Sequence, residues 1–134
     1  MTVVMQGKSV SPTKTEITHG PSGAVLATTA PLDNGGDGSS FSPTDLCAAS
    51  LGACTATIMT MFAAKRGVTL EVAFEVRKEM HPAPRRLGRL ELDFQLKTDC
   101  DEETFDAIVQ AGKACPVRLS LSGDVAVVDS YVRF

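Results

Sequence analysis

The residues of this sequence best suited to chemistry are its cysteines, two of which stand in distinctive stretches. Cys54 lies in the uncharged stretch GACTATIMTM (52–61), and Cys115 directly precedes Pro116 in KACPVRLSL (113–121). A thiolate is a nucleophile and two thiols can form a disulfide, so this pair could carry out redox chemistry. A free cysteine also packs as a small buried hydrophobe. The pattern alone leaves both interpretations open.

The cysteine spacing limits which thiols can pair. Cys47 and Cys54 lie two helical turns apart and would share one face of a helix. At about 1.5 Å of rise per residue their Cα atoms are roughly 10 Å apart, whereas a disulfide needs less than about 7 Å. Any redox partner therefore comes from elsewhere in the chain. Cys115 precedes a proline at which a helical turn can begin, where backbone N–H groups can stabilise a thiolate. Cys100 lies in an acidic turn and is expected to be a poor nucleophile.

Other common chemistries find no support in the sequence. No cysteine has a second cysteine or histidine at the close spacing typical of zinc ligands. The chain has no G-x-x-x-x-G-K-[ST] phosphate loop, and GGDGSS (35–40) lacks the flanking strand and helix of a dinucleotide fingerprint. His19 and His81 stand in predicted turns, where solvated side chains are expected. We expect neither a metal nor a nucleotide cofactor.

Length and composition predict a folded soluble protein. The chain has 134 residues, so we expect a single domain over residues 1–134. Hydrophobic residues make up 43% and charged residues 22%, as in ordinary globular proteins. A net charge of -3 creates no field that would attract nucleic acid or an anionic membrane. The N-terminal residues lack the pattern of a secretory signal, which predicts a cytoplasmic protein with reduced thiols.

A long helix must position Cys54. Residues 46–64 carry no charge, which nearly meets the requirement of about 20 apolar residues for a membrane span. Their many Ser, Gly, Thr and Ala residues would insert weakly into lipid, so we predict a buried soluble helix instead. It should run from about Pro43, with Ser42 as N-cap, to Arg66, and stop at Gly67. A helix apolar on every side must be covered on every side, so we expect a homodimer.

The other elements follow from the hydrophobic periods. TLEVAFEVRK and RLELDFQLK each place apolar side chains on one face and predict strands with one solvated face. KTEITH and GAVLATT flank the turn signal GPSG and predict a hairpin. DEETFDAIVQAGKA predicts a second helix, and DVAVVDSYVRF a final strand. This order of elements defines an α+β fold.

The stretch SFSPTDLCAASLGACTATIMTMFAAKRGVTLEVAFEV, followed by KACPVRLSL, resembles the OsmC/Ohr family of osmotically inducible and organic hydroperoxide resistance proteins. The resemblance implies antiparallel sheets packed around a long buried central helix, in an intertwined homodimer with active sites at the subunit interface. It implies a thiol-dependent peroxidase in which Cys54 attacks the peroxide and becomes a sulfenic acid, which Cys115 resolves as a disulfide. A dithiol donor would then reset the site, without metal, haem or nucleotide.

The charged residues around the thiol depart from the family pattern. Peroxidase branches of the family place an arginine in the N-terminal hairpin and a glutamate at the start of the long helix. Here no arginine precedes the helix, and the carboxylate is Asp45. We therefore predict that Asp45 and Arg118 act with the thiols, although Asp45 also suits the helix dipole. Arg85, Arg86 and Arg89, expected in a solvated hairpin connection, are an alternative source of positive charge from a second subunit.

Three functions stay open at this point. The first is a hydroperoxide reductase using Cys54 and Cys115. The second is a thiol-disulfide or persulfide-handling redox protein, and the third is a non-enzymatic dimeric ligand-binding protein whose cysteines only pack. Met59, Met61 and Phe62 could line an apolar pocket for an organic hydroperoxide, or they could simply belong to the core. Cys47 is expected to be a packing residue.

Overall fold

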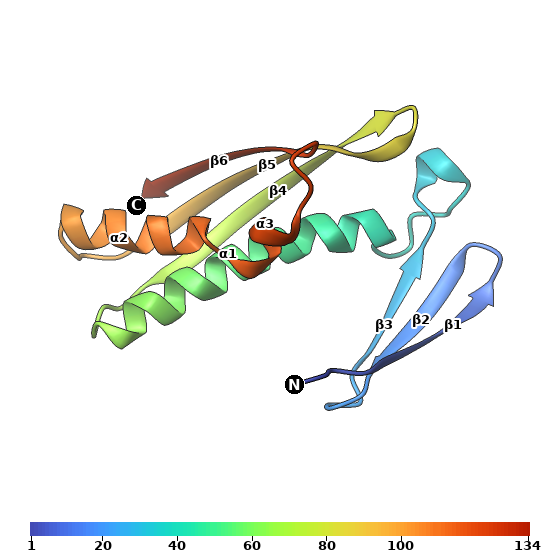
Figure 1. The fold of residues 1–134 in the computed structure, drawn as a ribbon, viewed down its shortest axis with the longest axis horizontal. Helices are drawn as coiled ribbons and strands as arrows, with labels where there is room; N and C mark the ends of the chain where they lie inside the picture. Colours follow the sequence, from blue (N-terminus) through green and yellow to red (C-terminus); the bar gives the residue numbers. More distant parts are fainter. The chain divides into compact units, whose positions relative to one another are not determined.

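The computed structural model describes residues 1–134, and the chain divides into two compact units, Met1–Leu46 and Cys47–Phe134. The elements follow one another as shown in Figure 1. In chain order they are β1 (Met5–Ser11), β2 (Lys14–His19), β3 (Val25–Thr29), the 3-10 helix η1 (Leu32–Asn34), α1 (Pro43–Lys65), β4 (Glu71–Pro82), β5 (Arg85–Lys97), α2 (Glu102–Lys113), α3 (Pro116–Ser120) and β6 (Ala126–Arg133). This confirms the predicted α+β class.

The first unit is a three-stranded antiparallel sheet in the order β1-β2-β3. The predicted hairpin is β2 and β3, joined by a turn in which Gly23 has φ 73°. β1 was not predicted, because its side chains are exposed throughout and MQGKSVS shows no clear apolar alternation. Asp37 stabilises the loop after β3. Its carboxylate accepts hydrogen bonds from Ser39 and forms a 2.8 Å ion pair with Lys14.

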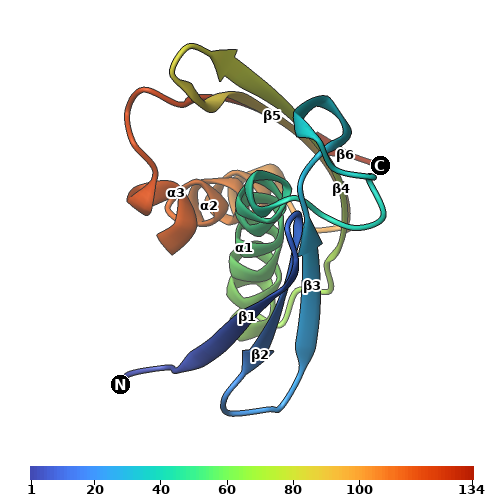
Figure 2. The ribbon, with the colours of Figure 1, turned by 90° about the vertical axis from the view of Figure 1, so that its right-hand side faces the viewer.

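The second unit has a three-stranded sheet in the order β4-β5-β6, with α1 and α2 on one of its faces (Figures 1 and 2). β4 and β5 form an antiparallel hairpin, but β6 pairs with β5 in parallel. This corrects the expectation of purely antiparallel sheets. A parallel pair needs a crossover connection, and the segment containing α2 and α3 provides it.

The core lies between this sheet and the helices. Leu90, Leu92, Phe94 and Leu96 alternate along β5 and are at most 1% exposed. Phe94 occupies the middle of an aromatic row across the three strands. Its ring centroid lies 5.8 Å from that of Phe74 on β4 and 5.1 Å from that of Tyr131 on β6, with which it stacks.

The ends of α1 agree closely with the sequence prediction. The Ser42 Oγ accepts a hydrogen bond from the Asp45 N–H at 3.0 Å, and the Ser42 N–H donates to Asp45 Oδ2 at 2.9 Å. This reciprocal pair satisfies two backbone donors at the helix start. At the other end Gly67 has φ 70°, and the Val68 N–H donates to the Ala63 carbonyl. A glycine in the left-handed conformation is the usual stop for a helix.

Only one face of α1 is buried within this chain. By length and composition the helix could span a membrane, with a mean hydropathy of 1.6 over a window that is 33% buried. Its buried residues are Ala48, Leu51, Gly52, Thr55, Met59 and Ala63. Met61, by contrast, is 51% exposed. The sequence predicted a helix buried on every side. Within one chain, a single face of α1 is buried.

Two glycines allow α1 to pack closely against its neighbours. A Cβ on Gly52 would lie 2.6 Å from the Phe74 ring of β4, and one on Gly112 of α2 would lie 2.6 Å from Met59 Cγ. Neither position has room for a larger side chain. These contacts bring α1 close to both β4 and α2.

Candidate thiol site

Cys54 and Cys115 meet inside the second unit. Cys54 stands in the middle of α1 and is partly buried, whereas Cys115 precedes α3 and has no exposed surface. Both thiols are free, and Cys115 lies close enough to Cys54 to raise the pKa of its thiol. The structure therefore brings together the two cysteines that the sequence singled out, from positions far apart along the chain.

Cys115 has two further polar neighbours. It is the N-cap of α3, and its Sγ accepts a hydrogen bond from the Arg118 N–H at 3.4 Å. The hydroxyl of Thr55, on α1, lies 3.5 Å from the same sulfur. The predicted helical turn at Pro116 is present, and it delivers a backbone N–H to the sulfur as expected.

The surroundings of Cys54 oppose its ionisation. Burial raises the pKa of the Cys54 thiol above its ordinary value, a hydrogen bond from the Val117 backbone lowers it, and the neighbouring Cys115 raises it further. The net direction is upward, because removal from water disfavours the charged thiolate. Efficient attack by Cys54 therefore requires added positive charge or a high pH.

Arg118 lies near the thiols but is engaged with a carboxylate. Its guanidinium forms a 2.7 Å ion pair with Asp129 on β6, whose Oδ2 also accepts a 2.7 Å hydrogen bond from the Tyr131 hydroxyl. Burial raises the pKa of Asp129, but the hydrogen bonds from Tyr131 and Arg118 lower it by more. Arg118 also interacts electrostatically with Cys115. Its charge is therefore close to the Cys115 thiol and is partly neutralised by Asp129.

The structure gives the other charged candidates local partners. Asp45 forms the hydrogen-bonded cap with Ser42 in the first turn of α1, within the first unit. In the β4–β5 hairpin, Arg86 donates to the carbonyls of Leu87 and Asp124, and Arg89 pairs with Glu91. Arg85 begins β5 in the same hairpin. Capping of the start of α1 is enough to explain why position 45 carries an acidic residue.

The predicted apolar cluster on α1 does not share one face. Met59 is fully buried against Gly112, whereas Met61 is half exposed. The Arg66 guanidinium lies over the Phe62 ring, with its Cζ atom 3.4 Å from the ring centroid. Cys47 and Cys100 are partly buried. No group of three or more His, Cys, Asp or Glu side chains is placed to hold a metal ion.

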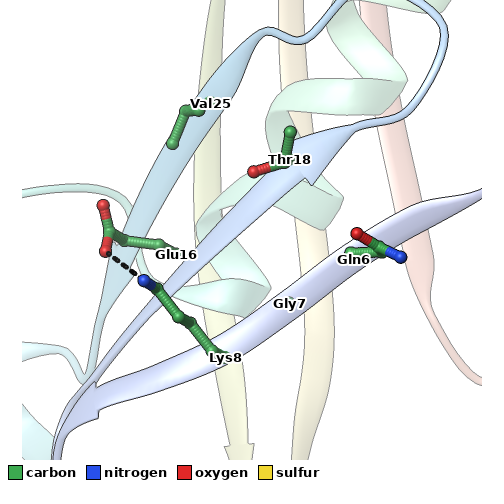
Figure 3. A pocket seen from close by; sticks show the side chains of 6 residues that line it. All are labelled: Gln6, Gly7, Lys8, Glu16, Thr18 and Val25. Atoms are coloured by element: carbon green, nitrogen blue, oxygen red, sulfur yellow. Dashed lines mark ion pairs between the residues drawn. The ribbon is translucent and has the colours of Figure 1, made fainter.

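A pocket in the first unit is polar and contains no thiol (Figure 3). It lies over the sheet and is lined by Gln6, Gly7, Lys8, Glu16, Thr18 and Val25. Lys8 and Glu16 face each other at 4.0 Å, with side chains that are 74% and 43% exposed. Water screens a pair this exposed, so it offers little binding energy to a ligand.

Sequence reasoning missed three residues of the thiol site: Thr55, Asp129 and Tyr131. Thr55 gave no signal in the sequence, because it is one of several small residues in an apolar helix. Asp129 did carry a signal, because in the strand AVVDSYVR it shares a face with Val127 and Tyr131, which a strand would cover. In the structure its side chain is only 14% exposed. A carboxylate on the covered side of a strand needs a partner, and Arg118 is that partner.

Comparison with known proteins places the chain in a family. The family model described as OsmC-like protein matches residues 36–128, which is more than half of the chain, so the protein belongs to the OsmC-like family. Among curated proteins none matches it. A solved structure from Psychrobacter arcticus, named for osmotic stress induction and a detoxification response, is 28% identical. That match covers 97% of this chain and 94% of the other, with a TM-score of 0.87.

Two more distant structures share the fold. The organic hydroperoxide resistance protein OsmC of Legionella pneumophila is 20% identical, covers 98% of this chain and 97% of its own, and has a TM-score of 0.66. The organic hydroperoxide resistance protein OhrB of Bacillus subtilis is 18% identical, with 98% of each chain covered and a TM-score of 0.62. The predicted family and fold are thereby confirmed.

Proposed function

We propose that this protein is a thiol-dependent peroxidase that reduces hydroperoxides through Cys54 and Cys115. The observation that carries the proposal is the pairing of a partly exposed thiol, Cys54, with a fully buried one, Cys115, whose sulfur lies 3.5 Å from the hydroxyl of Thr55, the residue after Cys54. The partly exposed Cys54 sulfur suits attack on a substrate. The buried Cys115 sulfur suits the second step, disulfide formation, in which water should not compete with it. The family membership and the names of its structural relatives agree with this assignment.

The reaction has three steps. The Cys54 thiolate attacks one oxygen of the peroxide, the O–O bond breaks, and the departing alkoxide takes a proton to leave as an alcohol. Cys54 is then a sulfenic acid. The Cys115 sulfur attacks the Cys54 sulfur, and hydroxide leaves and combines with the Cys115 proton as water. An external dithiol finally reduces the Cys54–Cys115 disulfide by two electrons and becomes a disulfide itself.

We also propose that the working form is a cytoplasmic homodimer. The uncovered face of α1 and the exposed apolar side chains of the first unit, such as Val4, Met5 and Leu26, support a partner subunit. A second chain could also bring a cation to Cys54, whose pKa is raised within one chain. Light scattering on the purified protein measures the mass directly.

A second candidate is a redox protein that reacts with disulfides or persulfides instead of peroxides. The same pairing of thiols supports it, because thiol–disulfide exchange also needs one reachable thiol and a second thiol beside it. The raised pKa of Cys54 slows both reactions alike, since each begins with attack by a thiolate. In this case the same two cysteines would still form the disulfide. The difference lies in the electrophile that oxidises Cys54.

Rapid mixing of the reduced protein with cumene hydroperoxide and with hydrogen peroxide separates the two. A peroxidase consumes one peroxide per chain, Cys54→Ser abolishes the reaction, and Cys115→Ser accumulates a sulfenic acid that mass spectrometry detects. The rate should rise with pH through and beyond 9.0, the ordinary value that the pKa of Cys54 exceeds. Cys100→Ser, outside the pair, serves as the control.

The proposal fails if peroxide oxidises the protein no faster than a free thiol at the same pH. Fast loss of thiols with a disulfide or persulfide reagent, but not with peroxide, would then establish the second candidate. An organic peroxide that reacts faster than hydrogen peroxide would indicate an apolar approach to Cys54.

A further inference from the structure

Thr55 differs from the other hydroxyl residues of α1. Ser50 donates to the Cys47 carbonyl at 2.6 Å, and Thr60 donates to the Thr57 carbonyl at 3.0 Å, as such residues commonly do within helices. Thr55 instead directs its hydroxyl to the sulfur of Cys115, sixty positions away along the chain. It is also only 2% exposed, so water cannot substitute for this partner.

Packing holds the Thr55 side chain in place. A Cβ on Gly112 would come within 3.2 Å of Thr55 Cγ2, so the threonine methyl already lies against the Gly112 backbone. A threonine in a helix chooses between two side-chain rotamers. A methyl confined by α2 selects one of them, and in the selected rotamer the hydroxyl faces Cys115.

A hydroxyl suits a sulfur that changes its protonation state. As a thiol, Cys115 can donate a hydrogen bond to the Thr55 oxygen; as a thiolate it can accept one from the Thr55 hydroxyl. The Arg118 N–H supplies a second, fixed donor to the same sulfur. The Thr55 hydroxyl and the Arg118 N–H together fix the orientation of the Cys115 sulfur. Cys54 precedes Thr55 on α1, so the sulfur is held near its proposed partner.

We propose that Thr55 is a positioning residue for Cys115: its hydroxyl orients the buried sulfur toward Cys54 and donates to it as it attacks. The inference rests on the proposed peroxidase function and adds a residue to its second step. In that step the S–S bond forms, the S–O bond of the sulfenic acid breaks, and the departing hydroxide takes the Cys115 proton. Thr55 returns to its starting state.

Other groups near Cys115 also respond to pH. Cys54 on α1, Arg118 on α3 and Tyr131 on β6 all interact electrostatically with it. Asp129 on β6 and Lys113 at the end of α2 interact with each other beside that cluster. None of these groups is changed by a substitution at Thr55, so a shifted pH profile in such a variant reports on the hydroxyl.

The test compares Thr55→Val, which keeps the shape and removes the hydroxyl, with Thr55→Ser, which keeps the hydroxyl. Rapid mixing with cumene hydroperoxide, with acid quench and mass spectrometry, follows sulfenic acid and disulfide separately. In Thr55→Val, disulfide formation should slow by about tenfold relative to sulfenic acid formation, the loss expected for one hydrogen bond to a charged atom. Its pH profile should also move upward.

Thr55→Ser should recover most of the rate and restore the profile, and Thr57→Val, an exposed position on the same helix, should behave as the wild type. An unchanged ratio of the two rates in Thr55→Val, or no recovery in Thr55→Ser, overturns the proposal.

A second measurement does not depend on peroxidase activity. The thiolate absorbance near 240 nm is titrated in Cys54→Ser, with Cys54→Ser/Cys115→Ser subtracted to isolate Cys115. Adding Thr55→Val should shift this titration to higher pH, and an unshifted titration also counts against the role of Thr55. If the wild-type protein does not reduce peroxide, the peroxidase proposal fails, while this titration still decides what the hydroxyl does.

Discussion

The two faces of the β4-β5-β6 sheet carry the same chemical pairing in different surroundings. On the face toward α1, Arg118 pairs with Asp129, whose side chain is 14% exposed. On the opposite face, Arg77 pairs with Glu75, Glu91 and Asp93, and its own side chain is 43% exposed. The outer arrangement has more ion pairs. The inner arrangement has one ion pair, whose Arg118 and Asp129 side chains are 28% and 14% exposed, so it is partly shielded from water.

Burial, and not the number of contacts, sets what each network does. Water screens exposed pairs, so the Arg77 network adds little to stability and keeps the outer face soluble. A shielded pair is different, because removing one partner leaves the other charge uncompensated. The Arg118–Asp129 pair therefore fixes the position of α3 against β6 and, with it, the position of Cys115. Four predictions test this contrast.

The largest difference should appear at neighbouring residues of β5. Phe94 is 1% exposed between Phe74 and Tyr131, whereas Gln95 points outward and is exposed. Phe94→Ala should lower the free energy of unfolding by about 4 kcal/mol, because it leaves a cavity at the centre of the core. Gln95→Ala should stay within about 0.5 kcal/mol of the wild type. Urea denaturation measures both, and equal effects would contradict the assigned faces.

Replacing one carboxylate on each face comes next. Asp129→Asn should cost about 2 kcal/mol of stability, since it leaves the Arg118 charge without its partner. Asp93→Asn removes a carboxylate that also bonds Arg77 and Ser130, yet it should leave the urea midpoint almost unchanged. The same two variants should differ in disulfide formation, with only Asp129→Asn disturbing Cys115. A larger loss from Asp93→Asn would reverse the ranking of the two networks.

Gly52 tests how closely the covered face packs. Alanine is usually better than glycine within a helix by about 1 kcal/mol. At this position its methyl would meet the Phe74 ring and Val76, and overpacking of this kind costs about 1–3 kcal/mol. We expect Gly52→Ala to be destabilising by about 1 kcal/mol. Gly123→Ala, where the added methyl meets nothing, is the matched control; thermal unfolding of both measures the difference.

The smallest effect is the pH dependence that comes from Asp129. Its folded-state pKa is lowered below 3.8, so its contribution to stability is complete above that pH and is lost as the pH falls through the folded pKa. The stability gap between the wild type and Asp129→Asn should therefore be constant from pH 7 to 5 and should narrow below pH 4. Urea midpoints at these pH values test the direction, and a gap that widens in acid would disprove it.

Local patterns were enough to predict most of the fold. The bounds of α1 followed from Ser42, Pro43 and Gly67, because capping and helix termination depend on neighbours within a few residues. The alternation in β4 and β5 identified the strands and the covered face of β5. β1 escaped prediction because none of its side chains is buried. The parallel pairing of β6 also escaped, because strand direction depends on where the crossover returns the chain.

The candidate site was likewise predicted only in part from the sequence. The two candidate cysteines were evident from their motifs and from the family resemblance. Their meeting, the contact of Thr55 with Cys115, and the engagement of Arg118 by Asp129 depend on residues from α1, α3 and β6 that are distant in the chain. No periodicity within one segment encodes such a contact.

β6 shows most clearly where sequence ends and tertiary structure begins. The alternation in AVVDSYVR determined that a strand would form, with Val128 and Val132 on one face and Asp129 and Arg133 on the other. Hydrophobicity alone does not choose between the two faces, because the second face also carries Val127 and Tyr131. The structure leaves Val128 and Val132 45% and 56% exposed and covers Asp129 and Arg133. Only the tertiary structure could decide this. Val127 and Tyr131 pack against the core, and Asp129 and Arg133 can be covered beside them only because Arg118 and the carbonyls of Thr98 and Cys100 are there to meet them.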